Sequence, residues 1–378
     1  MVLKMTAATP SNLIDMAALQ LSANPQLASP FFTSFPAEIR NRIYLEIWKL
    51  ASIRQHIVRT DPSEPGPTRW GHLPCITTLD VEDMRMDLYM AVDRNDLDRR
   101  LWVRRLKSQW CLHWPCEEQG QDYDTLVSGR HPVAVLERPA STGDQEDDHQ
   151  AVDHDDGASP VAVQRPRDGY LDILTTCKRM YLETLPSLYT NTTFIFTDTR
   201  TAAAFLARYG THFPLRSLEL CLRIPTIITE LYYPRSPHGG ILDDEGPPAI
   251  FAGQSRPALT AQHNPWQHLC DALAVLPDLQ NVRIWLDSGD LRPWHKRVSE
   301  ARFLARLRDV QVPKKRRFVV GLPELPERRG PDSQALEGHY LEGQRLESLP
   351  FVVERGRRPN NWGIHLTSMA LGPDGRAG

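Results

Sequence analysis

Apolar residues first recur with helical spacing in residues 36–50. One stripe carries Ile39, Ile43, Ile47 and Leu50, at intervals of three or four residues. The charged positions beside it are Arg40, Arg42 and Glu46, which we expect to stay in solvent. The pattern predicts an amphipathic helix whose apolar stripe needs a partner.

The predicted partner of this helix is a second periodic segment, residues 170–189. Its apolar positions recur every three or four residues: Leu171, Leu174, Cys177, Tyr181, Leu185 and Leu188. Pro186 removes a backbone N–H, so we expect the helix to break there. The first stripe is expected to pack against the second segment at Leu174, Cys177 and Tyr181. Lengthening a loop costs little free energy, so the long stretch between the two segments does not forbid this pairing.

Strand-like and helix-like segments then alternate to the end of the chain. Strands are predicted at residues 193–197, 216–224, 282–286, 317–321 and 351–353, and helices at 199–209, 264–276 and 293–309. Strand–helix alternation of this kind is typical of a parallel sheet with crossover helices. The predicted fold class is therefore α/β: an N-terminal helix packed on a mostly parallel, irregular strand–helix layer with long loops.

Composition suggests where these regions begin and end. Residues 1–30 are small and polar, which predicts a disordered leader, and residues 31–136 hold the first helix and a helical insertion. Seven acidic residues crowd into residues 144–156 without one Lys or Arg, so we expect 137–169 to be a disordered acidic linker. Residues 170–355 form the α/β domain and 356–378 a C-terminal tail.

Several of these segments resemble a large group of fungal proteins that share a domain of unknown function. The resemblance rests on FPAEIRNRIYLEIW at residues 35–48 and LTTCKRMYLETLPSLYTNTTFIF at 174–196. That group opens with an F-box-like LPxEIRNxIY helix and later carries a TCRxxYxEALPLLY helix followed by a TFxF strand. RSLELCL at 216–222 and VLPDLQNVRIWLD at 275–287 are also similar. Phe35 stands where the group has Leu, and the insertion after the first helix is long.

The resemblance implies a docking role for the first helix. An F-box binds the small adaptor subunit of a cullin-RING ubiquitin ligase, and the residues that would meet such a partner here are Phe35, Pro36 and Ile39. The alternative is that the two helices simply form a core together, because a true F-box keeps its helices contiguous. We therefore expect a protein-interaction module, in the manner of an F-box-like adaptor or a substrate-recognition protein.

Charge offers a different function. The chain has a net charge of −3, so no overall field favours nucleic acid or membrane. Residues 292–329 nevertheless hold twelve Lys or Arg against four Asp or Glu, with the run Lys314, Lys315, Arg316 and Arg317 at its centre. The alternative hypothesis is a nuclear, nucleic-acid-associated protein that uses this patch. A solvated entry to the following strand explains the same run, so we expect no nucleic-acid partner.

Cysteine and histidine raise the question of a metal. There are six cysteines and no CxxC pair, which favours reduced thiols and an intracellular protein, cytoplasmic or nuclear. Two segments would form a zinc site if they met; their Cys and His residues are His72, Cys75, Cys111, His113 and Cys116. Their spacing is not that of the common zinc motifs, so we expect incidental side chains, with no metal and no cofactor.

No motif for catalysis is present. The sequence lacks GxSxG, the P-loop GxxxxGK[ST], HExxH, and GxGxxG after a strand. No apolar run reaches the roughly 18 residues of a membrane span. We expect a protein that is not an enzyme and has no membrane partner.

Overall fold

A computed structural model describes nine stretches of the chain: residues 16–60, 69–77, 104–119, 173–232, 264–289, 294, 298–313, 316–325 and 349–357. The chain divides into two compact units. Unit 1 comprises residues 1–51 and 132–187, and unit 2 comprises residues 52–131 and 188–378. This division assigns the residues that follow the first helix to the unit that holds the sheet.

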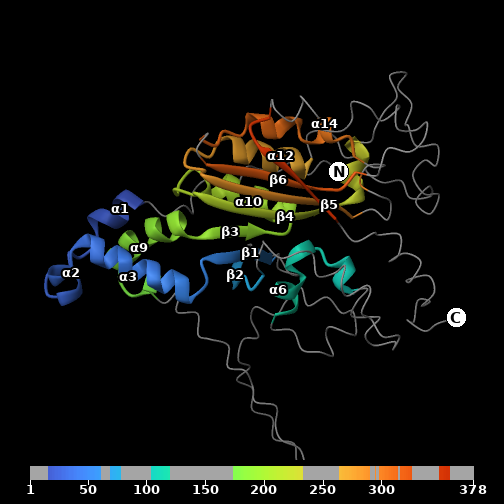
Figure 1. The fold of residues 1–378 in the computed structure, drawn as a ribbon. Coiled ribbons are helices and arrows are strands. Elements are labelled where there is room, and N and C mark those ends of the chain that lie inside the picture. The colour runs from blue at the N-terminus through green and yellow to red at the C-terminus, as the bar shows by residue number, and fades with distance from the viewer. Residues whose placement is uncertain are drawn as a thin grey trace, which may run out of the picture. The chain divides into compact units, whose positions relative to one another are not determined.

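Unit 1 is helical. It contains α1 (Met16–Leu21), α2 (Pro30–Ser34), α3 (Ala37–Leu50) and the greater part of α9 (Lys178–Asn191) (Figure 1). The predicted first helix is thus confirmed within one residue. Helix α1 lies inside the leader that we predicted to be disordered, and residues 1–15 and the acidic linker lie outside the described residues.

The two long helices of unit 1 are in contact, as predicted, through hydrogen bonds from α3 to Glu183 and Ser187 on α9. Of the predicted stripe, Ile43 and Ile47 are partly buried. The buried side of α3 carries Arg40, Tyr44 and Trp48, whereas Ile39 is 47% exposed and Leu50 is 89% exposed. The expectation that Arg40 stays in solvent is therefore wrong. It failed because Arg40 finds a carboxylate partner, Glu183 on α9, which offsets the cost of burying its charge.

Helix α9 differs from its prediction at both ends. It begins at Lys178, after a short turn, and it continues through Pro186 to Asn191. The expected break at Pro186 is wrong. A proline inside a helix removes one hydrogen bond, and packing of the helix can outweigh that loss.

Unit 2 is built on a seven-stranded sheet with the order β2-β1-β3-β4-β5-β6-β7. The strands are β1 (Arg54–Thr60), β2 (Arg69–Pro74), β3 (Thr193–Phe196), β4 (Ser217–Ile224), β5 (Asn281–Ser288), β6 (Arg317–Pro323) and β7 (Val352–Gly356). Strands β1 and β2 pair antiparallel, and every other pair is parallel. The α/β class with a mostly parallel sheet is confirmed. β1 and β2 were missed, because we expected residues 31–136 to hold only the first helix and a helical insertion.

One face of this sheet carries the main apolar core. Leu220, Leu222, Ile284 and Leu286 are fully buried there, as the strand pattern predicts. The core is completed by α10 (Thr199–Tyr209), α12 (Pro265–Ala274), α14 (Glu300–Phe303) and the 3-10 helix η5 (Ala305–Asp309) (Figure 1). Asp198 caps α10 and Asn264 caps α12 through their side chains. The long helix expected at 293–309 is replaced by α14 and η5 in its described part.

The other face of the sheet binds residues 104–119. This segment contains the 3-10 helix η1 (Cys111–His113) and α6 (Trp114–Glu118). Alternate residues of β4 hold it: the Arg223 guanidinium donates to the carbonyls of Leu106 and Ser108, and Glu219 contacts His113.

Two further short helices, α11 (Thr226–Thr229) and η2 (Glu230–Tyr232), follow β4. None of the helices in the described part of the chain is both long and apolar enough to cross a membrane.

Candidate metal centre

Four metal-ligating side chains converge in unit 2. They are His56 on β1, Cys75 just after β2, His113 in η1 and Cys116 in α6. One possible ligand atom from each lies within 4.8 Å of those of the others. His56, His113 and Cys116 are buried, and Cys75 is partly buried. This is a two-cysteine, two-histidine set of the kind that holds zinc in structural sites.

Three features of the local fold bring the four residues together. Antiparallel pairing returns the chain to the start of β1, where the Cys75 N–H donates to the Arg54 carbonyl at 2.9 Å. Strand register places His56 beside Ile195, and Ile195 beside Glu219, on one row of the sheet. Residues three apart share a helical face, so η1 and α6 present His113 and Cys116 together.

The distances match those around a tetrahedral zinc ion. The two sulfur atoms lie 3.8 Å apart, and the Nδ1 atom of His113 lies 3.4 Å from Cys75 Sγ and 4.0 Å from Cys116 Sγ. Bond lengths of about 2.3 Å for zinc–sulfur and about 2.0 Å for zinc–nitrogen give sulfur–sulfur edges of about 3.8 Å and sulfur–nitrogen edges of about 3.5 Å. The sulfur atoms are far beyond disulfide distance, and all six cysteines are free.

His56 is the one member of the group whose polar atoms make no hydrogen bond of ordinary geometry, and its polar interaction is with Cys116, another member of the group. Its side chain is 1% exposed, and neither Nδ1 nor Nε2 makes a hydrogen bond. Its ring packs against Trp110 and His113, with centroid distances of 4.6 and 4.8 Å. Burial lowers the pKa of His56, so the imidazole stays neutral, which is the form that binds metal. Leaving a buried polar group unpaired costs about 1–3 kcal/mol.

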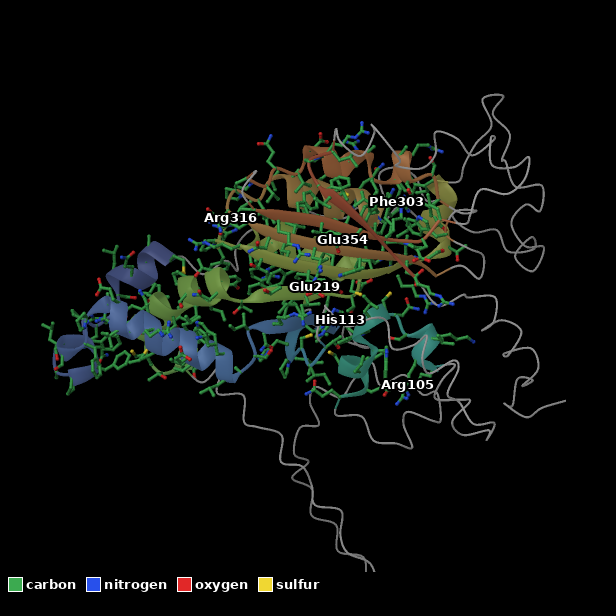
Figure 2. The ribbon with its side chains drawn as sticks, viewed as in Figure 1. Arg105, His113, Glu219, Phe303, Arg316 and Glu354 are labelled. Atoms are coloured by element: carbon green, nitrogen blue, oxygen red, sulfur yellow. The ribbon has the colours of Figure 1, made fainter. Side chains whose placement is uncertain are left out.

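His113 is oriented by a carboxylate behind it. Its Nε2 lies 2.7 Å from Glu219 Oε1 (Figure 2). Arg54 donates to the other oxygen of Glu219 at 2.8 Å. Burial alone would raise the pKa of Glu219, but His113 and Arg54 outweigh it and lower the pKa. The Nε2–H of His113 therefore points at a carboxylate while Nδ1 faces the sulfur atoms. Metal-bound histidines are commonly fixed in this way.

The pKa values of the two cysteines shift in opposite directions. The pKa of Cys116 is lowered, chiefly by a hydrogen bond with Cys75, and the pKa of Cys75 is raised by the same bond. The Ile76 N–H lies 3.4 Å from Cys116 Sγ, and the Thr77 hydroxyl lies 3.1 Å from it. The Ile76 N–H donor favours the thiolate form of Cys116, which is the form that binds a metal.

The sequence named three of the four residues and missed one. Cys75, His113 and Cys116 belong to the group, but His72 and Cys111 do not. His72 contacts the Gln55 side chain at 3.2 Å, and Cys111 is buried beside Cys221. His56 was overlooked because it lies in an unpredicted strand. Only recognition of β1 would have placed it near the others.

The residues predicted to meet an adaptor lie on the surface of unit 1. Phe35 is 44% exposed, Ile39 is 47% exposed, and Pro36 is exposed between them. Arg40, one residue further on, is buried and donates to the Phe35 carbonyl at 2.6 Å. This hydrogen bond fixes the backbone that presents the exposed residues.

Two of the four residues of the predicted basic patch are among the described residues. Arg316 and Arg317 are exposed, and Lys314 and Lys315 lie outside the described residues. Arg317 pairs with Glu354 at 3.3 Å. The described part of the patch thus offers less free positive charge than its sequence suggests.

Comparison with known proteins places the chain in a family without assigning an activity. Residues 112–336, more than half of the chain, match the family model described as Domain of unknown function (DUF7730). No curated protein and no solved structure matches the chain. The matched region contains His113, Cys116 and Glu219, and it begins after His56 and Cys75. The chain belongs to the DUF7730 family.

Proposed function

We propose that this protein is a zinc-stabilised protein-interaction module and not an enzyme. The observation that carries the proposal is the buried group of His56, Cys75, His113 and Cys116, in which His56 has no hydrogen-bond partner. A bound ion would accept the lone pair of one His56 nitrogen. That bond would offset the free-energy cost of burying the nitrogen without a hydrogen bond.

Zinc is the metal that fits this ligand set. Thiolate and imidazole ligands in a tetrahedral arrangement select zinc, whereas calcium and magnesium prefer oxygen. Four protein ligands would close the coordination sphere, which is the pattern of a structural site and leaves no position for substrate. Thiolate ligation also needs reduced cysteines, in keeping with an intracellular protein.

The stabilising role follows from which segments the ion would join. His56 and Cys75 come from the β1–β2 pair, and His113 and Cys116 come from the segment that lies on β4. Cys75 and Cys116 are 41 residues apart in the sequence. An ion at this place would cross-link them and favour the folded state over the unfolded chain.

Metal analysis of the full-length protein tests the proposal. We expect about one zinc ion per chain, and cobalt substitution should give the absorption of a tetrahedral site with thiolate ligands. Cys116→Ser and His56→Ala should lose the metal. His72→Ala and Cys111→Ser are matched controls, because both residues lie nearby and outside the group. Wild-type protein that is metal-free and binds neither ion would overturn the proposal.

The interaction role rests on a different observation, the exposure of Phe35, Pro36 and Ile39 beside the hydrogen bond from Arg40 to the Phe35 carbonyl. Adjacent apolar side chains on a surface are typical of a docking site. The resemblance of this helix to an F-box supports the adaptor subunit of a ubiquitin ligase as the partner. Co-expression with the adaptor and pull-down tests this, with Ile39→Ser to disrupt binding and Arg42→Ser as an exposed control on the same helix. A complex that tolerates Ile39→Ser, or no complex, would contradict it.

A further inference from the structure

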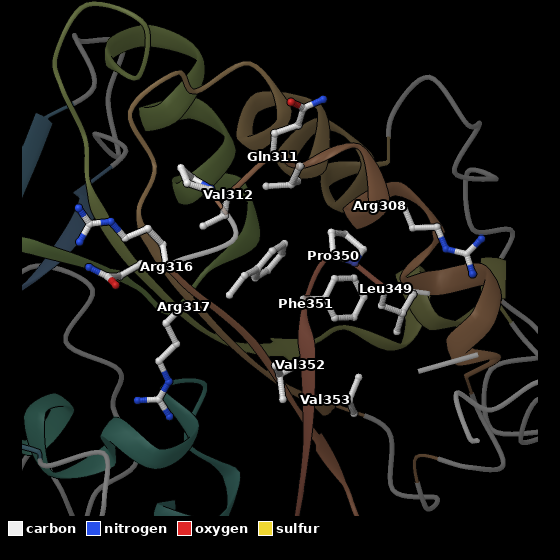
Figure 3. A pocket seen from close by; sticks show the side chains of 14 residues that line it. Arg308, Gln311, Val312, Arg316, Arg317, Leu349, Pro350, Phe351, Val352 and Val353 are labelled. Carbon is white, nitrogen blue, oxygen red and sulfur yellow. The ribbon is translucent and has the colours of Figure 1, made fainter. Parts of the chain in front are cut away.

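A groove in unit 2 lies at the amino ends of β5, β6 and β7. Its volume is about 1110 Å³, and Figure 3 shows Arg308 and Arg316 on different sides of it. We call it the arginine groove and define it by Arg308, Arg316, Arg317, Val312, Phe351 and Val352. Catalytic sites of parallel sheets lie at the opposite, carboxyl ends of the strands, so this position favours binding over catalysis.

The charge of the groove is of one sign. Three arginines line it, and none of its lining residues is Asp or Glu. Arg317 pairs with Glu354, whereas the structure gives Arg308 and Arg316 no ion pair with any described residue. Both side chains are exposed. They are therefore available to an anionic partner.

The floor of the groove is apolar. Val310, Phe318 and Phe351 are buried beneath it, and Val352 is 62% exposed at its edge. Val352 belongs to β7, the last strand of the described sheet. An edge strand offers backbone groups to which an extended peptide can add, with alternate side chains reaching pockets below.

We propose that the arginine groove binds an acidic peptide segment of a partner protein in an extended conformation. Its carboxylates contact Arg308 and Arg316, and its alternate apolar side chains lie on the floor. Nucleic acid fits less well, because single strands are held by stacking on exposed aromatic rings, and Phe318 and Phe351 are buried. This function goes beyond the zinc site and beyond the turn at Phe35.

The test uses the full chain and a short fluorescein-labelled peptide that alternates glutamate with leucine. Fluorescence polarisation should show saturable binding that weakens as salt is added. The double variant Arg308→Glu and Arg316→Glu should bind at least about tenfold more weakly, because it replaces attraction by repulsion at both sides of the groove. A peptide with glutamine in place of glutamate should also bind more weakly.

Matched controls separate the groove from general charge. Arg306→Glu makes the same change on the same short helix as Arg308 but outside the groove, and it should leave affinity within about twofold. Leu349→Ser removes apolar surface from the groove without changing charge and should weaken binding. The proposal is overturned if wild-type protein does not bind the peptide or if Arg306→Glu weakens it equally. A labelled oligonucleotide that binds through Arg308 and Arg316 in place of the peptide would also overturn it.

Discussion

Two carboxylates, one in each unit, each organise a polar network, and the networks differ in one respect. Glu183 in unit 1 accepts from Arg40 at 2.8 and 3.0 Å, from Tyr44 at 3.0 Å and from Arg179 at 3.3 Å. Glu219 in unit 2 contacts Arg54 and His113, but that network continues to His113 Nδ1 and the sulfur atoms and ends beside an unpaired His56.

The difference distinguishes a structural network from a ligand site. Around Glu183 the carboxylate accepts hydrogen bonds from Arg40, Tyr44 and Arg179 without any further group, so this network stabilises unit 1 by itself. Beyond Glu219 and His113, the buried His56 imidazole lies close to Cys75 and Cys116, and neither of its nitrogens makes a hydrogen bond. A cation is the group that would complete this network.

The largest expected effect is that of Glu219→Ala. The buried His113 and the partly buried Arg54 would be left without their acceptor, and breaking a buried pair costs about 3–5 kcal/mol. Zinc affinity should fall about 10–100-fold, because Glu219 orients His113. Denaturant unfolding and metal competition measure the two effects. Glu219→Gln keeps an acceptor for His113 and should lose less; equal losses in both variants would contradict the orienting role.

A smaller effect is expected for Glu183→Ala, about 2 kcal/mol, because this carboxylate is partly exposed. Burial alone would raise the pKa of Glu183, but Arg40 and Tyr44 lower it below its ordinary value of 4.5. The stabilisation is therefore complete above about pH 4.5 and is lost as the pH falls through the lowered pKa. Unfolding of wild type and variant across this range checks it. A difference that grows in acid would refute the prediction.

The variant His56→Phe should change the free energy of unfolding by about 1 kcal/mol. The sign of the change should differ between metal-free and zinc-loaded protein. In metal-free protein an apolar ring replaces an unpaired buried imidazole, so stability should stay equal or rise. In zinc-loaded protein the change removes a ligand and should lower stability. Thermal unfolding with and without a chelator gives all four values. If zinc raises the melting temperature of the variant as much as that of wild type, His56 is not a ligand.

The smallest effect on stability belongs to Ile39→Ser. Because Ile39 is 47% exposed, the free energy of unfolding should change by no more than about 0.5 kcal/mol. Ile284→Ser is the matched comparison in the buried sheet, where the same kind of change should cost several times more. Urea unfolding of the two variants measures both. Similar losses would show that the apolar stripe of α3 is a core face after all.

Local patterns predicted much of the sheet and little of the site. Strands β3 to β7 were found because each shows a short apolar run or an alternation of apolar and polar residues. Strand β1 was missed, since Arg54, Gln55 and His56 give no apolar signal. Their polarity is required by the site itself: His56 belongs to the metal group, and Arg54 pairs with Glu219. The polar residues of the candidate metal site are therefore the ones that obscured this strand in the sequence.

The sequence by itself determined the α/β class, the parallel order of strands and helices, and the burial of Leu220 and Ile284, because periodicity is a property of neighbours along the chain. Only the tertiary structure decided which charged and metal-ligating residues are buried. Arg40 meets Glu183 across 143 residues, and His113 meets Glu219 across 106. A buried charge or imidazole is stable only with a partner, and partners so distant in sequence are chosen by the folded chain.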